Sequence, residues 1–375
     1  MSHVATPRRV EMVVPSLVTA GMEMVVATLS RALARRGHEV GVTCTQEIGA
    51  IGEQLQSEGF SVALVPAPGV ITNVWPRALA RWFTTRRPDI VHVHSGVWLK
   101  AARAAGMAGK IPVVHTVHGL LDVEPWHEGL IKRAAARRSA AIVTVSEALR
   151  ADLVTRVGID RPAPEVILNG IDTQRFAPGP RTMVLRRAMQ VDDATPVVGH
   201  VGRFSPVKNH RLLLEAFARV GGKHPTARLA LIGDGELRGA LESQADALGI
   251  RDRVYFAGEH RAVAPLLADL DVCVLCSISE GTSISLLESL ASGKACVATA
   301  VGGNLAVLDQ GNAGVLVPSN DVSALAQALD DLLASPGMRR DVAQRARAHA
   351  LAAYSEESMT RAYERVYERA LAARR

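Results

Sequence analysis

Aromatic residues are scarce in this sequence: phenylalanine, tryptophan and tyrosine together make up 4% of its 375 residues. Proteins that bind single-stranded nucleic acid stack bases on aromatic side chains, and no nucleic-acid recognition motif is present. Long hydrophobic runs are also missing, since Glu11, Pro15 and Glu23 interrupt the apolar stretch near the N-terminus. A membrane-spanning helix needs about 20 consecutive apolar residues. We therefore expect neither nucleic-acid binding nor a membrane span.

Cysteine is rare as well, and four cysteines in a chain of this length indicate a reduced, cytoplasmic protein. Cys273 and Cys276 form a C-x-x-C pattern inside an apolar, strand-like run. Residues three apart on a strand point to opposite faces. We therefore interpret both as core residues, not as metal ligands.

The net charge of +6 falls mostly before residue 180, with dense basic clusters at 81–87 and 132–138. Such clusters are often solvated helix faces. They also suit an anionic substrate or anionic lipid headgroups. The expected location is thus the cytoplasm, with peripheral contact to the inner membrane face as an alternative that the clusters leave open.

Strand and helix patterns alternate along the chain. Residues 9–15, 23–37 and 38–44 are predicted as strand, helix and strand, and the same order restarts with a strand at 196–204 and a helix at 209–225. Strands separated by helices form parallel sheets that are covered on both faces. The sequence therefore predicts an α/β protein with two doubly wound, Rossmann-like domains.

The domain boundary is predicted in the proline-rich, polar segment 176–196, which we interpret as a linker and hinge. This places the N-terminal domain at 1–178 and the C-terminal domain at 179–355. A last helix at 356–375, capped by Ser355, is expected to pack back on the first domain.

Two glutamates, Glu280 and Glu288, lie eight positions apart among small residues, directly after the apolar run that contains Cys273. A helix is predicted to begin near Thr282 or Ser283, which would hold Glu280 at the end of a strand. Paired carboxylates can bind the hydroxyls of a sugar. A capped helix with an incidental glutamate would look the same.

Two cations, Arg203 and Lys208, follow another apolar strand and precede a helix. A guanidinium and an ammonium on one loop suit a diphosphate. Ordinary surface residues are the alternative, although surface cations rarely follow so apolar a run.

Taken together with the segments VILNGIDTQRF (166–176) and LIGDGELR (231–238), these residues resemble the retaining glycosyltransferases of family 4. The resemblance covers nearly the whole chain and keeps the order of the family's motifs. It implies the GT-B fold, in which two Rossmann-like domains face each other across a crevice.

The resemblance also implies a donor site. Arg203 and Lys208 match the pair that binds the donor diphosphate, Glu288 the glutamate that holds the ribose, and Glu280 the one that contacts the transferred sugar. The remaining residues implied to bind the donor are Gly21, Phe256, Thr282, Ser283 and Ile284. An aromatic residue commonly follows the Glu-Gly pair in this family, and its replacement by Thr282 leaves the donor sugar open.

On the acceptor side, the resemblance places His118 near the reacting centre as a catalytic residue beside Glu280, Arg203 and Lys208. Trp98 is a weaker acceptor candidate. The implied reaction moves a hexose-type sugar, with retention, from a nucleotide sugar to a glycan, lipid-linked or small-molecule acceptor, in bacterial cell-surface glycan or glycolipid synthesis. No cofactor or metal is expected.

Histidines at positions 92, 94, 115 and 118 could suggest a metal site, but no carboxylate completes a ligand set among them, although Asp122 follows. A dehydrogenase is disfavoured because the glycine spacing of its fingerprint is absent. A GT-B hydrolase or epimerase and a non-catalytic sugar-nucleotide-binding protein remain alternatives.

Overall fold

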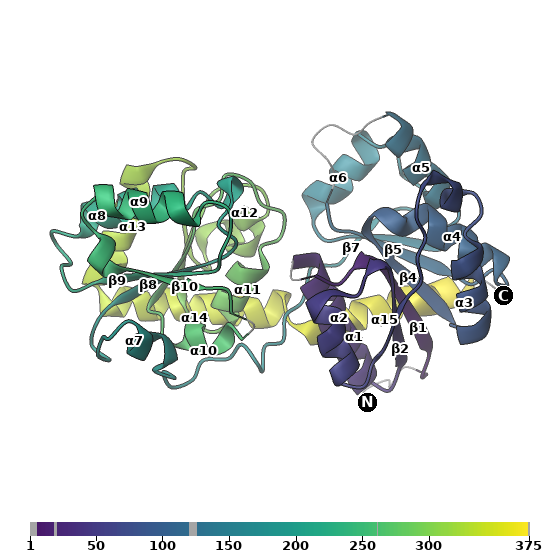
Figure 1. Ribbon diagram of the computed structural model, residues 1–375, viewed down its shortest axis with the longest axis horizontal. Coiled ribbons are helices and arrows are strands. Elements are labelled where there is room, and N and C mark those ends of the chain that lie inside the picture. Colours follow the sequence, from purple (N-terminus) through teal and green to yellow (C-terminus); the bar gives the residue numbers. More distant parts are fainter. Residues whose placement is uncertain (1–5, 19–20, 120–125, 261, 374–375) are drawn as a thin grey trace. The chain divides into compact units, whose positions relative to one another are not determined.

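The computed structural model describes residues 6–18, 21–119, 126–260 and 262–373. The chain divides into two compact units (Figure 1). Unit 1 comprises the chain up to Gly170 together with the segment from Glu356 onward, and unit 2 comprises Ile171–Ser355. The boundary therefore falls at residues 170 and 171, a little before the predicted position at 178 and 179.

Unit 1 is built on a parallel sheet. Its described strands are β1 (Arg9–Ser16), β2 (Glu39–Glu47), β3 (Ser61–Leu64), β4 (Ile90–His94), β5 (Val113–Val117), β6 (Ala141–Thr144) and β7 (Glu165–Val166). They lie in the order β3-β2-β1-β4-β5-β6-β7, and neighbouring strands run parallel. The order reverses between β1 and β4, as in doubly wound folds.

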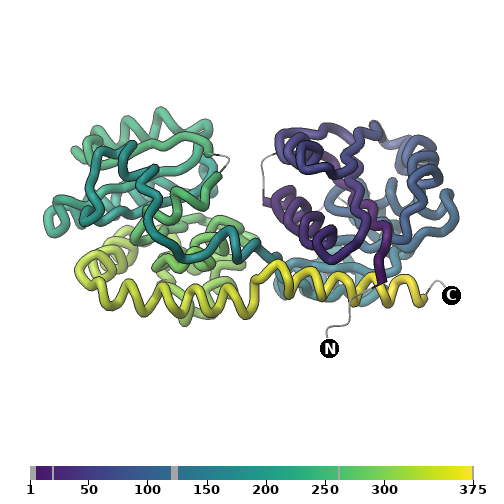
Figure 2. Tube along the Cα trace, turned by 90° about the horizontal axis from the view of Figure 1, so that it is seen from below, coloured from purple at the N-terminus to yellow at the C-terminus, as the bar shows by residue number. Residues whose placement is uncertain are grey.

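Helices cover both faces of this sheet. They are α1 (Gly21–Arg35), α2 (Gly49–Ser57), α3 (Arg77–Arg86), α4 (Trp98–Met107), α5 (Trp126–Ala136), α6 (Glu147–Thr155) and α15 (Glu356–Ala372), with short 3-10 turns such as η1 (Val70–Asn73). The C-terminal helix α15 lies against unit 1 (Figure 2), where Glu364 pairs with Arg36 at 2.6 Å and the Tyr367 hydroxyl contacts His92 at 2.7 Å.

Unit 2 repeats the architecture. Its strands are β8 (Val197–Val201), β9 (Arg228–Ile232), β10 (Val254–Gly258), β11 (Val272–Leu275), β12 (Ala295–Thr299) and β13 (Val315–Val317), in the parallel order β10-β9-β8-β11-β12-β13. Its helices are α7 (Val184–Ala188), α8 (His210–Val220), α9 (Arg238–Ala247), α10 (Ala264–Ala268), α11 (Ile284–Ala291), α12 (Asn304–Val307), α13 (Val322–Ala334) and α14 (Pro336–Ala353). The two parallel sheets confirm the predicted fold class.

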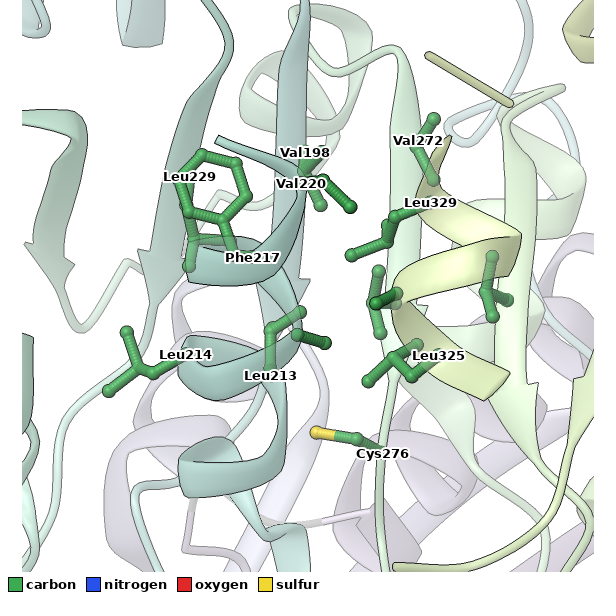
Figure 3. Close-up of a cluster of buried hydrophobic side chains, with 14 of the residues drawn as sticks. Val198, Leu213, Leu214, Phe217, Val220, Leu229, Val272, Cys276, Leu325 and Leu329 are labelled. Carbon is green, nitrogen blue, oxygen red and sulfur yellow. The ribbon is translucent and has the colours of Figure 1, made fainter. Parts of the chain in front are cut away.

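The core of unit 2 lies between the sheet and the helices α8 and α13 (Figure 3). Helix α8 is amphipathic, and its residues Leu213, Phe217 and Val220 face the sheet because they recur at helical spacing. Leu329 of α13 meets them from the neighbouring helix. Cys276 is buried in the same cluster, which confirms its interpretation as a core residue.

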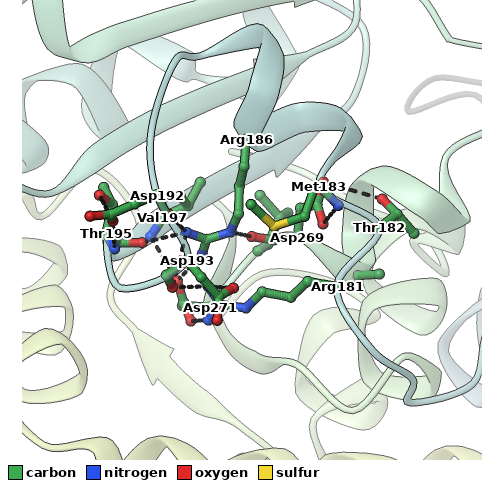
Figure 4. A network of polar contacts seen from close by, with 12 residues as sticks. Arg181, Thr182, Met183, Arg186, Asp192, Asp193, Thr195, Val197, Asp269 and Asp271 are labelled. Carbon is green, nitrogen blue, oxygen red and sulfur yellow. Dashed lines mark hydrogen bonds and ion pairs between the residues drawn. The ribbon is translucent and has the colours of Figure 1, made fainter.

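The polar segment predicted as a hinge is fixed within unit 2 (Figure 4). Arg186 is fully buried, and its guanidinium donates to the Asp271 carboxylate at 2.8 Å and to the Asp269 main-chain oxygen at 3.0 Å. The Asp269 carboxylate in turn accepts from the main-chain nitrogens of Met183 and Leu185, each at 2.8 Å. A buried, bonded arginine is costly to expose, so this segment lacks the character of a flexible linker.

Candidate functional site

Three loops of unit 2 leave the sheet at the same edge. They follow β8, β11 and β12, which are neighbours in a parallel sheet. Ligands of doubly wound folds bind at the carboxyl ends of the strands. The four charged residues among those predicted to hold the donor lie on two of these loops and on the helix α11 that follows one of them; they are Arg203, Lys208, Glu280 and Glu288.

The loop after β8 is held by the main chain of the 231–238 motif. Main-chain nitrogens of Gly202 and Phe204 donate to the oxygens of Ile232 at 3.0 Å and Asp234 at 2.9 Å. Gly233 has φ of +141°, and a Cβ atom there would stand 2.0 Å from the Gly202 oxygen. No other residue fits this position without moving the loop. Arg203, between the two anchored residues, is exposed.

Lys208 and Glu280 form an ion pair between the loops after β8 and β11. The Lys208 Nζ atom donates to Glu280 Oε1 at 2.5 Å, and the Ser277 hydroxyl donates to the same oxygen at 2.6 Å. Thr299, at the end of β12, donates to the Ser277 main-chain oxygen at 2.6 Å. The second carboxylate oxygen, Oε2, has no hydrogen-bond partner among the described residues, so one face of the carboxylate is fixed and the other is available.

The main chain at Lys208 is also held by a contact with the end of β11. The Cys276 thiol lies 3.3 Å from the Lys208 main-chain oxygen and 3.2 Å from that of Asn209. Sequence reasoning assigned Cys276 to the core and did not foresee this contact, nor the role of Ser277. The sequence offered one indication of these contacts: Cys276 and Ser277 come directly after a buried strand and just before Glu280.

A glycine pair after β12 closes the site from the side. The Gly303 main-chain nitrogen donates to the main-chain oxygen of Glu280 at 3.1 Å. A Cβ atom on Gly302 would stand 2.0 Å from that same oxygen, and one on Gly303 would stand 1.8 Å from the Gly281 oxygen. The close approach of these backbones requires glycine at both positions, which sequence reasoning also missed.

Helix α11 begins at Ile284, next to the predicted start, and Ser283 caps it by accepting from the Leu286 main-chain nitrogen at 3.4 Å. The first N–H groups of a helix have no partner inside the helix. They therefore add partial positive charge beside Glu280, in the segment that also contains Thr282.

Glu288 lies inside helix α11 and is buried. Burial raises the pKa of its carboxyl to about 7, with Arg175 acting in the opposite direction. The carboxyl therefore changes its charge near neutral pH, and hydrogen-bond donors of a ligand would favour the charged form.

Phe256 lies on β10, the strand at one edge of the sheet of unit 2. Its ring is buried in the core against Phe204, with centroids 6.2 Å apart, and the Arg251 guanidinium covers it at 5.2 Å. The ring is therefore not exposed for stacking, and the base contact that the resemblance implies for this segment stays a prediction.

In unit 1, Gly21 and His118 lie at the carboxyl-end edge of the sheet. Gly21 opens α1 and is exposed, whereas Ala20 is outside the described residues. His118 follows β5 and is half-buried, and its Nε2 atom lies 2.9 Å from His94 Nδ1. Burial lowers the pKa of His118 to about 4, so its imidazole is neutral at neutral pH.

Trp98 does not offer its ring to an acceptor, contrary to expectation. The indole is buried, stacks on His115 with centroids 3.9 Å apart, and donates from Nε1 to the Ser139 hydroxyl at 2.8 Å. Its position on an amphipathic helix explains why: the large apolar side chain fills the core of unit 1.

The histidines of β4 and β5 take part in buried contacts. His92 lies 2.8 Å from the Thr116 hydroxyl on one side and contacts Tyr367 on the other. Within the described ranges, no group of three or more histidines, cysteines or carboxylates is arranged to hold a metal ion. Asp122 falls outside those ranges.

Comparison with known proteins identifies the class. Residues 184–349 match the family model for glycosyl transferases group 1, and residues 19–175 match the model for glycosyltransferase family 4. The chain is 31% identical to a D-inositol 3-phosphate glycosyltransferase of Geodermatophilus obscurus, over 85% of this chain and 80% of that one. It is 29% identical to a 2-deoxystreptamine N-acetyl-D-glucosaminyltransferase of Streptomyces fradiae, over 92% and 90%.

Solved structures agree on the fold. A glycosyltransferase from Rickettsia africae superposes with a TM-score of 0.86 at 20% identity, covering 97% of this chain and 99% of that one. Anabaena HepE in complex with UDP gives a TM-score of 0.80 at 22% identity, covering 95% and 98%. The chain belongs to glycosyltransferase family 4 and is a glycosyltransferase of the GT-B type, which sets the dehydrogenase alternative aside. Within the parts of the chain that the structure describes, every helix is too short or too polar to cross a membrane.

Proposed function

We propose that this glycosyltransferase moves a hexose-type sugar, with retention and without a metal ion, from a nucleoside diphosphate sugar to an acceptor hydroxyl. The observation that carries the proposal is the ion pair between Lys208 and Glu280, with Arg203 on the same loop as Lys208. It brings one cation for phosphate and one carboxylate for sugar hydroxyls within 2.5 Å of each other, which suits a ligand that joins phosphate to sugar.

The cations would act on the leaving group. Negative charge grows on the nucleoside diphosphate as its bond to the sugar breaks, and positioned donors that meet this charge lower the barrier. Arg203 is exposed and has no side-chain partner among the described residues, so its guanidinium is available for a phosphate. Lys208 would contribute a point charge while Glu280 keeps it in place.

The carboxylates would hold the two sugars of the donor. Glu280 presents Oε2 to hydroxyls of the transferred sugar, and Glu288 would accept from the ribose hydroxyls. His118, with a neutral ring, can accept or donate a hydrogen bond at a sugar hydroxyl. In a retaining transfer on the same face of the sugar, the donor phosphate takes the acceptor proton, so no side chain has to form a covalent intermediate.

The acceptor is proposed to be a small hydroxylated molecule, in preference to a cell-surface glycan. Support comes from the two relatives described above, whose names give 2-deoxystreptamine and D-inositol 3-phosphate as the molecules that they glycosylate. Transfer is favoured over donor hydrolysis or epimerisation because both relatives, aligned over most of the chain, are named as transferases.

A binding screen tests whether Arg203 takes part in binding the nucleoside diphosphate of the donor. Thermal shift with UDP, GDP, ADP and dTDP, without metal, is expected to show stabilisation of the wild-type protein by one diphosphate, because a ligand that binds the folded state raises its stability. Arg203→Ala should lose most of this shift. Arg187→Ala, which removes an exposed arginine elsewhere in unit 2, is the matched control.

The proposal would be overturned if none of the four diphosphates stabilised the wild type, or if Arg187→Ala and Arg203→Ala lost the shift equally. Where one diphosphate binds, its sugar conjugates are then incubated with inositol phosphates and aminocyclitols. Release of free sugar at the same rate with and without acceptor would indicate a hydrolase.

A further inference from the structure

A cavity of about 850 Å³ lies in unit 1, at the sheet edge opposite to His118. Its floor is the start of β5 and β6, with Ile111, Pro112 and Ala140. The last turn of α4, the C-terminal end of α15 and Trp75 form its walls. The lining is mostly apolar, and the volume is that of an ordinary small-ligand site. The proposed donor and acceptor chemistry does not use it, whereas Arg137 and Arg138 at its rim belong to the basic cluster at 132–138 of the sequence.

Four cations surround the cavity: Arg103, Lys110, Arg137 and Arg138. None of them pairs with a carboxylate among the described residues, and no described acidic residue lines the cavity. Some basic residues elsewhere in unit 1 are paired with carboxylates, as Arg86 is with Glu11 at 3.4 Å and Arg36 with Glu364 at 2.6 Å. Unpaired cations around an apolar cavity create a site of positive potential that favours an anionic ligand with an apolar part.

Large apolar side chains are exposed next to the cavity. Trp75 and Met107 line it and are 58% and 48% exposed. The adjoining turn η1 adds Val70 and Ile71, at 77% and 74% exposed, and it packs on α4, which forms the cavity wall. Contiguous exposed apolar side chains mark an interaction surface, and tryptophan prefers the boundary between lipid and water.

We propose that the surface formed by the cavity rim, Trp75 and the η1 turn, at the amino ends of strands β5 and β6, docks on a bilayer that contains anionic lipid. Arg103, Lys110, Arg137 and Arg138 would bind headgroup phosphates, and Trp75 with the η1 turn would enter the headgroup region. Charge complementarity favours a bilayer, because each lysine or arginine near an anionic surface contributes about 1 kcal/mol. The proposal does not depend on the proposed donor or acceptor, since it concerns adsorption only.

The geometry separates docking from sugar chemistry. Strand β5 runs from the cavity to His118, and its five residues span roughly 16 Å at about 3.3 Å per residue. The bilayer would therefore contact one end of the sheet while the predicted catalytic histidine lies at the other. It follows that His118→Ala should bind vesicles as the wild type does, and that docking variants should keep their affinity for the nucleoside diphosphate.

Vesicle flotation tests the proposal, with phosphatidylcholine vesicles that contain or lack phosphatidylglycerol. The full chain should float with the anionic vesicles and remain unbound with the neutral ones. Arg137→Glu combined with Arg138→Glu should lower partitioning at least tenfold, since the contribution of about 1 kcal/mol per basic residue is lost twice and then reversed. Arg187→Glu combined with Arg340→Glu makes the same change of charge on exposed arginines of unit 2 and should bind as the wild type does.

A second pair of variants tests whether the exposed apolar side chains contribute to membrane binding. Trp75→Ser should weaken flotation several-fold, whereas Trp126→Ser, which removes another exposed tryptophan of unit 1, should not. Brominated lipid should quench the fluorescence that Trp75 contributes. The proposal is overturned if the wild type shows no preference for anionic vesicles, if both arginine pairs lower binding equally, or if Trp75 is not quenched.

Discussion

Glu288 shows how a single buried carboxyl can lower the stability of the folded protein. A carboxyl that is buried without a close cation prefers to be neutral, and its pKa rises from 4.5 to about 7. The folded state then binds a proton more tightly than the unfolded chain. By linkage, the free energy of unfolding falls as pH rises from the unfolded pKa to the folded one, and the penalty is complete above about pH 7.

We therefore predict that Glu288→Gln is more stable than the wild type at about pH 8, by up to about 3 kcal/mol for a shift of this size. At about pH 5 the gain should largely disappear, because the wild-type carboxyl is then protonated in the folded state. Urea unfolding of both proteins at the two values measures this. The variant should bind the nucleoside diphosphate more weakly, as loss of the proposed ribose contact requires. A stability difference that does not change with pH would contradict the raised pKa of Glu288.

At this scale the sequence singled out Lys208 and Glu280, which the structure pairs, and did not predict the residues that hold them; their roles in donor binding stay predictions. Charged side chains next to apolar runs are conspicuous, so Lys208 and Glu280 could be found. The hydroxyl of Ser277 and the backbone of Gly302 act through three-dimensional proximity, which spacing along the chain does not reveal. Trp98 was misjudged for the same reason, because its burial depends on helix orientation.

Among the elements, the loops after β8 and β9 act as one unit. Gly233 has φ of +141°, and an added Cβ would meet the Gly202 oxygen at 2.0 Å. Strand and helix order was predictable from the alternation of apolar patterns, and the parallel sheets follow from it. The linker prediction for 176–196 was less successful, because proline and charge indicate a loop and cannot show that Arg186 is buried in an ion pair with Asp271.

We predict that Gly233→Ala lowers the free energy of unfolding by about 2 kcal/mol or more, because it combines positive φ with a clash against main chain. It should also abolish the thermal shift by the nucleoside diphosphate, since the loop that bears Arg203 must move. Gly239→Ala is the matched control: that glycine lies in helix α9 with open space around it, and alanine there should be neutral or stabilising by up to about 1 kcal/mol. Equal behaviour of the two variants would refute the proposed support of the loop.

On the scale of the whole molecule, the chain enters unit 2 after Gly170 and returns to unit 1 at Glu356. Unit 1 is therefore incomplete until the last segment of the chain is present. Helix α15 gives it four large side chains that are nearly fully buried, Met359, Tyr363, Val366 and Tyr367. Unit 2 is continuous in sequence and contains its own core.

Removal of residues 356–375 should consequently unfold unit 1 and spare unit 2. Burial of a large apolar side chain contributes about 2 kcal/mol, so four of them amount to about 8 kcal/mol, which is comparable with the entire stability of a typical domain, about 5–15 kcal/mol. Calorimetry of the truncated chain should show one transition where the full chain shows the unfolding of two units, and the remaining transition should still shift with the nucleoside diphosphate. Arg365→Ala, on the exposed side of α15, should leave the whole profile unchanged. Loss of both transitions in the truncated chain would mean that unit 2 cannot fold without unit 1, and an unaltered profile would mean that α15 contributes little to the core of unit 1.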